Sequence, residues 1–253
     1  MHAVVVSFDQ WSLGFLGCYG NPTVKTPNLD RLATQSVVFD QHFGENFDST
    51  AVNHAWWTGR YQFPLNHDEQ AALPVIFGMP GFADIEQRFL VDVESSHAQQ
   101  IQKRFGDMSN VESVGREEIF DKAIAHFHSG NDSLTEKSLL WIQSPGPRLN
   151  TDSKQQTEDL LSNYHRQAEE FDTELGELLA VLEALEERAQ PLLVITAGEG
   201  ENILCAYDST TEENFLSEER VHCPLLISIS GSDQAGSRRQ VLTQTMDIGP
   251  TLA

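Results

Sequence analysis

The chain has 253 residues, enough to bury a full core as one large domain. It carries 16 Lys and Arg residues against 38 Asp and Glu residues, a formal net charge of −22. Such a negative field repels nucleic acid and anionic membrane surfaces, so neither is expected as a partner. No stretch approaches the roughly 18 consecutive apolar residues that a membrane span needs.

The N-terminal residues enter a strand pattern at once, without the basic and apolar regions of a secretion signal. The three cysteines, Cys18, Cys205 and Cys223, are widely spaced and form no CxxC pattern. Buried thiols in a reducing compartment are the ordinary interpretation of such spacing, and a cytoplasmic protein is expected. The oligomeric state is not readable from the sequence.

Short apolar runs alternate with helical patterns along the chain. Strands are predicted at 3–8, 37–43, 88–93, 138–143, 192–197 and 223–229. Helices are predicted at 27–36, 50–58, 116–130 and 158–187. This alternation predicts a single α/β domain over residues 1–253, a three-layer α/β/α sandwich around a mixed, mostly parallel sheet. Residues 246–253 resemble a helix that starts at a proline, and the chain stops inside it, so a fragment is expected.

Polar residues follow several of the predicted strands. In parallel α/β sheets, ligands bind outside the carboxyl ends of the strands. Asp9 and Gln10, the turn 144–148 and the segment 197–201 lie at such ends. The helix that starts near Ser49 can join them, because the free N–H groups of a helix N-terminus bind anions.

Several segments resemble the sulfatase family of the alkaline phosphatase superfamily, in the same order along the chain. They are GFLGCYGNPTVKTPNLDRLATQSVVFDQHF (14–43), TGRYQFPLNH (58–67), the long helix, ITAGEGE (195–201), RVHCPLLIS (220–228) and MDIGPTLA (246–253). DQW (9–11) is similar to the first metal loop of the phosphonate monoester hydrolase and choline sulfatase branches. The resemblance implies the family fold, without a counterpart of its small C-terminal domain.

The resemblance also implies a divalent cation, usually calcium, held by oxygen ligands. Asp9 and Gln10 match the first ligand pair, and Glu199 stands at a His or Asn ligand position. Gly198 stands where the family has an Asp, so we expect weak metal binding or none. Asp9 has a second interpretation, because an Asp at a strand end also caps the following turn.

The family's nucleophile is a formylglycine made from a Cys or Ser. Ser49 stands at that position, and the substrate implied is a small anionic ester. The motif normally contains an Arg that orients the modified side chain, and here Asn53 replaces it. In its other interpretation, Ser49 is an N-cap of the helix 50–58.

The family residues that contact the sulfate also differ here. Gly146 stands where the family has a His, and no Lys takes the place of the lysines that bind the sulfate oxygens. His97 is a candidate site histidine. Arg148 either replaces a lost cation near the substrate or is a solvated loop residue. Trp56 and Trp57 are expected to be packing residues.

Two functions follow from this reading. The first is a sulfatase-family protein with a degraded nucleophile and metal site, which is catalytically weak or inactive. The alternative is an active hydrolase of sulfate, phosphonate or phosphate esters, which uses Ser49 or its formylglycine with an altered metal site.

Overall fold

The computed structural model describes most of the chain. The described residues are 2–45, 49–62, 75–76, 82, 85–95, 98–105, 110–128, 137–149, 157–185, 190–201 and 217–252. Within them, no helix is long and apolar enough to span a membrane.

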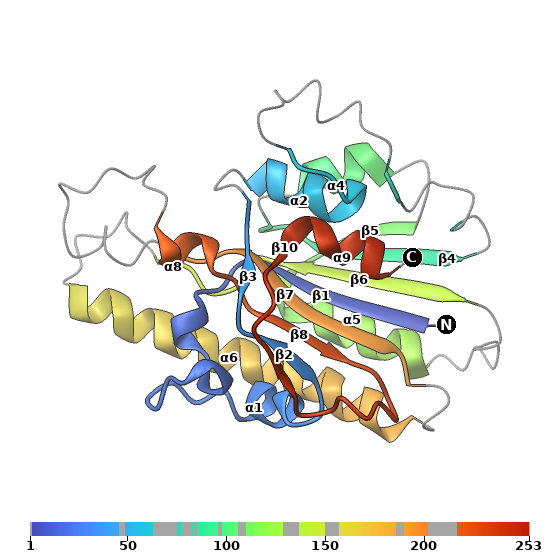
Figure 1. The fold of residues 1–253 in the computed structure, drawn as a ribbon. Helices are drawn as coiled ribbons and strands as arrows, with labels where there is room; N and C mark the ends of the chain where they lie inside the picture. Colours follow the sequence, from blue (N-terminus) through green and yellow to red (C-terminus); the bar gives the residue numbers. More distant parts are fainter. Residues whose placement is uncertain are drawn as a thin grey trace.

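A large sheet forms the centre of the molecule (Figure 1). Its eight strands lie in the order β5-β4-β6-β1-β7-β8-β2-β9. In chain order the strands are β1 (His2–Gln10), β2 (Val37–Phe39), β4 (Glu86–Asp92), β5 (Asn110–Val114), β6 (Ser138–Ser144), β7 (Leu192–Glu199), β8 (Leu225–Ser228) and β9 (Arg238–Arg239). All pairs from β5 to β7 and the pair β2–β9 are parallel, whereas β8 is antiparallel to β7 and to β2. The predicted mixed, mostly parallel sheet is confirmed.

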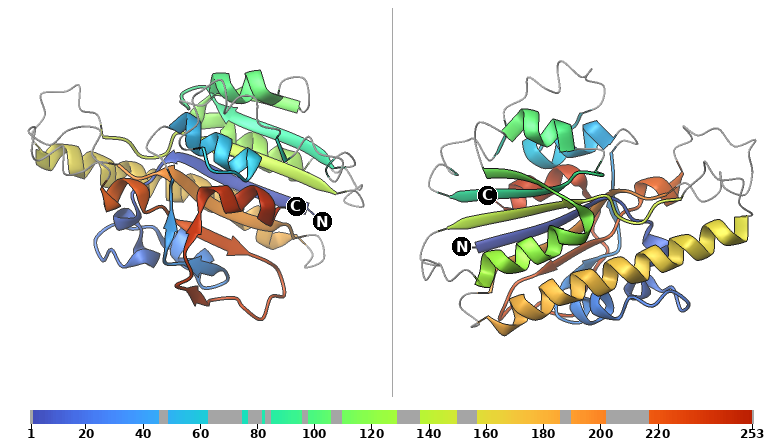
Figure 2. Two further views of the ribbon diagram at one scale, coloured as in Figure 1. Left: turned by 45° about the horizontal axis from the view of Figure 1, so that its top comes forward. Right: turned by 180° about the vertical axis from the view of Figure 1, so that it is seen from behind.

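Helices cover both faces of this sheet (Figure 2). One layer contains α1 (Pro27–Ala33), α5 (Arg116–His128) and α6 (Thr157–Ala184). The other contains α2 (Ser49–Thr58), α4 (Ala98–Phe105) and α9 (Ile248–Thr251). The three-layer α/β/α architecture is therefore also confirmed.

The alternation of side chains in β1 explains why both layers are needed. Val4, Val6 and Phe8 belong to the core under α1, α5 and α6, whereas Ala3 and Val5 belong to the core under α2 and α4. Successive residues of a strand point to opposite faces, so a strand that is apolar throughout must be covered on both sides. Trp56 and Trp57 are fully buried in the second core, as expected of packing residues.

Two details differ from the sequence prediction. The strand expected at 37–43 is split: β2 ends at Phe39, and His42–Phe43 form β3, which pairs with β10 (Thr243–Gln244) in a separate two-stranded sheet. The break occurs because Asp40 and Gln41 turn the chain toward the 239–243 segment. The Asp40 N–H donates to the Arg239 carbonyl oxygen, and the Gln41 carbonyl oxygen accepts from the Thr243 N–H. The last helix starts at Ile248 rather than at its proline.

The elements α4 and β5 were not predicted. Among the described strands, β5 is at the edge of the sheet and pairs only with β4. Of its last four residues, Val114 is buried and Ser113 is exposed, with the other two intermediate. An edge strand that is only partly buried lacks the continuous apolar run by which the central strands were found.

Candidate active site

Asp9 lies near the carboxyl end of β1, where its side chain is only 2% exposed. Its Oδ1 accepts hydrogen bonds from Ser95 Oγ at 2.8 Å and from Gln143 Nε2 at 2.7 Å. Its Oδ2 accepts a hydrogen bond from Arg148 Nη2 at 2.8 Å. Both oxygens of the carboxylate therefore face hydrogen-bond donors of the chain itself, and the charge is matched by a guanidinium.

Arg148 is placed by the turn that follows β6. Its N–H donates to Gln167 Oε1 at 3.1 Å, and Gln167 Nε2 donates to the carbonyl oxygen of Arg148 at 2.9 Å. At the start of the turn, Gln10 N–H donates to the Pro145 carbonyl oxygen at 3.2 Å. Arg148 is thus held between α6 and β1: it is a partly solvated loop residue whose guanidinium pairs with Asp9.

Gly146 has a role in the same turn. Its φ is +74°, and a Cβ built at this position would lie 2.0 Å from the Gln10 carbonyl oxygen. Any side chain here is excluded both by the backbone conformation and by the close approach of β1. The absence of a histidine at position 146 is therefore required by the path of the turn.

Glu199 ends β7, and its side chain is 9% exposed. Arg220 Nη2 donates to Glu199 Oε2 at 2.9 Å, and Gln10 Nε2 makes a long contact of 3.5 Å with Oε1. Burial raises the pKa of Glu199, and the hydrogen bond and charge of Arg220 oppose this shift. The second carboxylate of the site also has an arginine partner.

Arg220 belongs to the short helix α8 (Glu218–Val221). The helix is brought to the end of β7 by Gly200, whose N–H donates to the Arg220 carbonyl oxygen at 2.7 Å. A Cβ at position 200 would lie 1.9 Å from the Glu219 carbonyl oxygen. No sequence motif indicates a site role for Arg220, Ser95 or Gln143. Only Gln143 left a signal in the sequence, as a polar residue inside an apolar strand run.

Gly198 is enclosed on the side where a ligand side chain would begin. A Cβ at this position would lie 3.1 Å from the Asp9 carbonyl oxygen and 3.1 Å from Val52 Cγ1. It would also lie 3.4 Å from Trp56 Cη2. Val52 and Trp56 of α2 therefore pack closely against Gly198.

The remaining candidate residues have different outcomes. The helix α2 begins at Ser49 itself, so Ser49 is a helical residue rather than a residue before the helix; its side chain lies outside the described part. Asn53 is fully buried, and neither amide atom has a hydrogen-bond partner among the described residues. His97 lies outside the described residues.

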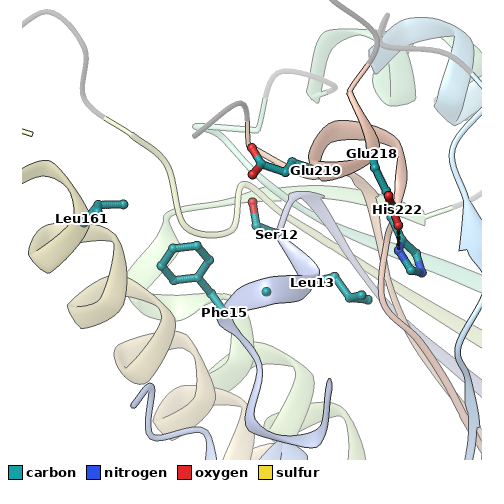
Figure 3. A pocket seen from close by; sticks show the side chains of 8 residues that line it. Ser12, Leu13, Phe15, Leu161, Glu218, Glu219 and His222 are labelled. Carbon is teal, nitrogen blue, oxygen red and sulfur yellow. Dashed lines mark ion pairs between the residues drawn. The ribbon is translucent and has the colours of Figure 1, made fainter. Parts of the chain in front are cut away.

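A cavity of about 450 Å³ opens beside this cluster (Figure 3). Leu13, Phe15 and Leu161 form its apolar part, and Glu218 and Glu219 of α8 lie on the opposite side. Ser12 also lines it and is joined to the chain after β7, because Ser12 Oγ accepts from the Glu201 N–H at 2.7 Å. Two carboxylates in its wall make this cavity unfavourable for an anionic ester.

The described residues contain no group of three or more His, Cys, Asp or Glu side chains placed to hold a metal ion. Asp9, Gln10 and Glu199 lie at the carboxyl ends of the neighbouring strands β1 and β7. Asp9 and Glu199 each pair with an arginine of their own, Arg148 and Arg220, and Gln10 contacts Glu199.

The chain is similar to known proteins in sequence and in fold. Steryl-sulfatase of Homo sapiens is 43% identical over 58 residues, which are 23% of this chain and 10% of that protein. Arylsulfatase D of Homo sapiens is 40% identical over 65 residues, which are 26% of this chain and 11% of that protein. The aligned regions are thus about a tenth of these relatives' length.

Solved structures with the same fold cover nearly the whole chain. A protein reported with the metabolism of multiple glycosaminoglycans by Bacteroides thetaiotaomicron has a TM-score of 0.76 at 14% identity, covering 98% of this chain and 71% of its own. The phosphonate monoester hydrolase of Agrobacterium radiobacter has a TM-score of 0.71 at 14% identity, covering 99% and 72%. The C-terminal periplasmic domain of a phosphoethanolamine transferase from Campylobacter jejuni has a TM-score of 0.76 at 10% identity, covering 99% and 87%.

At such low identity, these structures show the fold alone. The family model described as Sulfatase matches residues 2–253. This match over nearly the whole chain shows that the chain belongs to the sulfatase family.

Proposed function

We propose that this chain is a sulfatase-family protein that hydrolyses esters weakly or not at all. The observation that carries the proposal is the packing around Gly198. The family has a metal-ligating Asp at this position, and here Val52 and Trp56 of α2 lie within 3.4 Å of where its Cβ would be. The ligand is missing, and the first atom of its side chain would already lie in tight contact with Val52 of α2 and with the Asp9 backbone.

The ligands that remain do not fit a divalent cation. Calcium takes six to eight oxygen ligands, several of them carboxylates whose lone pairs point at the ion. The lone pairs of Asp9 accept hydrogen bonds from Ser95, Gln143 and Arg148. Glu199 is paired with a guanidinium in the same way. An ion at this place would have to displace both arginines while gaining no ligand from position 198.

The residues near the expected nucleophile also support weak or absent hydrolysis. Asn53 is a neutral amide at the position of the family's orienting arginine, and it is fully buried. Gly146 cannot be replaced by the family's histidine without moving the turn. Loss of one electrostatic contact to the transition state typically costs about 10²–10³ in rate, so loss of several leaves little catalysis.

The test is a comparison of turnover and of the chemical form of residue 49. Wild-type protein is produced together with a formylglycine-generating enzyme and assayed with 4-nitrophenyl sulfate, 4-nitrophenyl phosphate and a 4-nitrophenyl phosphonate. We expect rates equal to those of the matched variant Ser49→Ala, with and without calcium, magnesium or manganese. Peptide mass should show Ser49 unmodified, without the loss of about two daltons that formylglycine formation causes.

A Ser49-dependent rate with any of these esters supports the alternative, an active hydrolase with an altered metal site. That alternative has one structural argument in its favour. The first turn of α2 lies beside the end of β7, because a Cβ at Gly198 would lie 3.1 Å from Val52 Cγ1. A helix N-terminus there has free N–H groups for an anionic ester.

A further inference from the structure

We infer that Arg148 and Arg220 act as built-in cations, which take over the charge-balancing role of a metal ion and make this site independent of metal. The inference deepens the proposed function and rests on it. Its test measures stability rather than turnover, so the two can fail separately.

The first step is the charge balance at the end of the sheet. Asp9 and Glu199 carry two negative charges and are 2% and 9% exposed as side chains. A buried carboxylate without a partner is strongly unfavourable, so each needs a cation or a proton. Arg148 and Arg220 contribute two positive charges at 2.8 Å and 2.9 Å. An arginine cannot lose its charge in the ordinary pH range, so this compensation is permanent.

The second step is that both arginines are delivered in the same manner. Each belongs to a segment whose backbone passes extremely close to a strand end, at Gln10 for one and at Gly200 for the other. A glycine permits each approach: a Cβ at position 146 would lie 2.0 Å from a carbonyl oxygen, and a Cβ at position 200 would lie 1.9 Å from one.

The third step is that the Arg148 segment is held in place before any ion could bind. Two hydrogen bonds to Gln167 fix the backbone of Arg148. The next N–H, of Leu149, donates to Glu201 Oε2 at 3.2 Å. With its backbone fixed in this way, Arg148 loses only side-chain freedom when it pairs with Asp9, whereas an arginine on an unfixed segment would lose backbone freedom as well.

The two ion pairs differ in exposure, so the loss of stability on removing each arginine is expected to differ. The Arg220 side chain is 14% exposed, and that of Arg148 is 38% exposed. Water therefore screens the Arg148–Asp9 pair more than the Arg220–Glu199 pair, through the exposed part of Arg148, although Asp9 itself is buried. Removal of either arginine leaves a buried carboxylate behind, and the loss at Glu199 should be the greater.

The experiment measures Tm in 1 mM EDTA and in 1 mM calcium, magnesium, manganese or zinc. A specific ion site with a Kd of about 10 µM would raise Tm by about 5–10 °C at this concentration. We expect changes below about 1 °C for the wild-type protein. The variants Arg148→Gln and Arg220→Gln should lower Tm by about 4–10 °C each in EDTA. The control Arg166→Gln removes a surface pair with Glu170, at an arginine that is 61% exposed, and should change Tm by less than about 2 °C.

A double-mutant cycle isolates the contribution of the Arg148–Asp9 pair from other effects of each substitution. Asp9→Asn should lower Tm on its own, and should remove most of the effect of Arg148→Gln when the two are combined. A divalent-ion response that appears in Arg148→Gln and is absent from the wild type also supports the inference. A wild-type Tm that rises with a divalent ion and stops rising in Asp9→Asn overturns it. So does a Tm of Arg148→Gln equal to that of the Arg166→Gln control.

If Arg148→Gln fails to fold, the wild-type titration still decides whether a metal ion binds. Arg148→Lys, which keeps the charge and loses the planar donor group, then tests the geometry. It should be intermediate between the wild type and a protein without the pair. A Tm equal to that of the wild type at every ion concentration would show that any nearby charge is sufficient, and would overturn the specific role of this guanidinium.

Discussion

Gly146 and Gln10 touch through their backbones, and this contact gives Arg148 its path to Asp9. A Cβ at position 146 would lie 2.0 Å from the Gln10 carbonyl oxygen, and the φ of Gly146 is +74°. We predict that Gly146→Ala lowers the free energy of unfolding by about 2–4 kcal/mol, from the left-handed backbone and the forced shift of the turn. Urea denaturation measures it.

The matched control for this prediction is Gly14→Ala. None of the described residues lies within 4 Å of a Cβ at position 14, and the φ of Gly14 is not positive. Its change should stay within about 0.5 kcal/mol, as for ordinary surface substitutions. Equal effects of the two variants would contradict the close approach at Gly146.

Gly200→Ala tests the close approach of α8 to the end of β7, at a position where alanine brings no strain from a positive φ. The φ of Gly200 is not positive, yet a Cβ there would lie 1.9 Å from the Glu219 carbonyl oxygen. We predict a loss of about 1–3 kcal/mol in the free energy of unfolding, because α8 must move away from β7. Gly115→Ala is the control and should be nearly neutral, because no atom of the described part of the chain lies within 4 Å of its Cβ. Thermal or urea unfolding of the two variants checks this, and an unchanged Gly200→Ala would rule out the packing described for α8.

Gly198→Asp should not restore metal binding. The new side chain would start 3.1 Å from Val52 Cγ1 and 3.4 Å from Trp56 Cη2, in a site whose two carboxylates are already paired. A third buried carboxylate without a partner costs at least about 3 kcal/mol. We predict a lower Tm and no response to calcium or magnesium, measured by thermal unfolding and isothermal titration. Calcium binding by this single variant would show that Val52 and Trp56 move aside at little cost and would contradict the prediction.

The pH dependence of stability should contain a contribution from Glu45. Burial raises the pKa of Glu45 from 4.5 to about 7, and Asp247 adds to this shift. The folded protein therefore takes up a proton between about pH 7 and 4.5 that the unfolded chain does not. The contribution of Glu45 to stability rises as the pH falls through this window, and is constant below it.

The comparison of wild type with Glu45→Gln isolates this contribution. The variant should be more stable than the wild type at pH 8, and the difference should shrink toward zero near pH 4.5. Burial also lowers the pKa of His42, to about 3, which reduces stability as the pH falls below 6.5. Because His42 is present in both proteins, its effect cancels in the difference. Tm values measured from pH 4.5 to 8 test this, and a difference that does not vary with pH would contradict it.

Most of the fold followed from local patterns. The apolar run of β1 and the long stripe of α6 each have one period over many residues, and each period predicts one element type. The position of Asp9, Gln10 and Glu199 at strand ends followed as well, because parallel strands end at a common edge. The split of 37–43 and the edge strand β5 did not, since both depend on which segment pairs with them.

The candidate site shows most clearly the difference between what local patterns predict and what depends on the pairing of distant segments. The sequence alone determined that the chain has carboxylates at two strand ends, a glycine at position 198 and an asparagine at position 53. Only the tertiary structure decided that these carboxylates are neutralised by arginines. Arg148 lies 139 residues after Asp9, and Arg220 lies 21 residues after Glu199. No local period links such residues, because their pairing depends on two backbone approaches that exist only when the strand ends, the turn after β6 and α8 are assembled. The same holds for Gly198: its missing side chain is visible in the sequence, but the packing of Val52 and Trp56 against it arises only when α2 lies on the sheet.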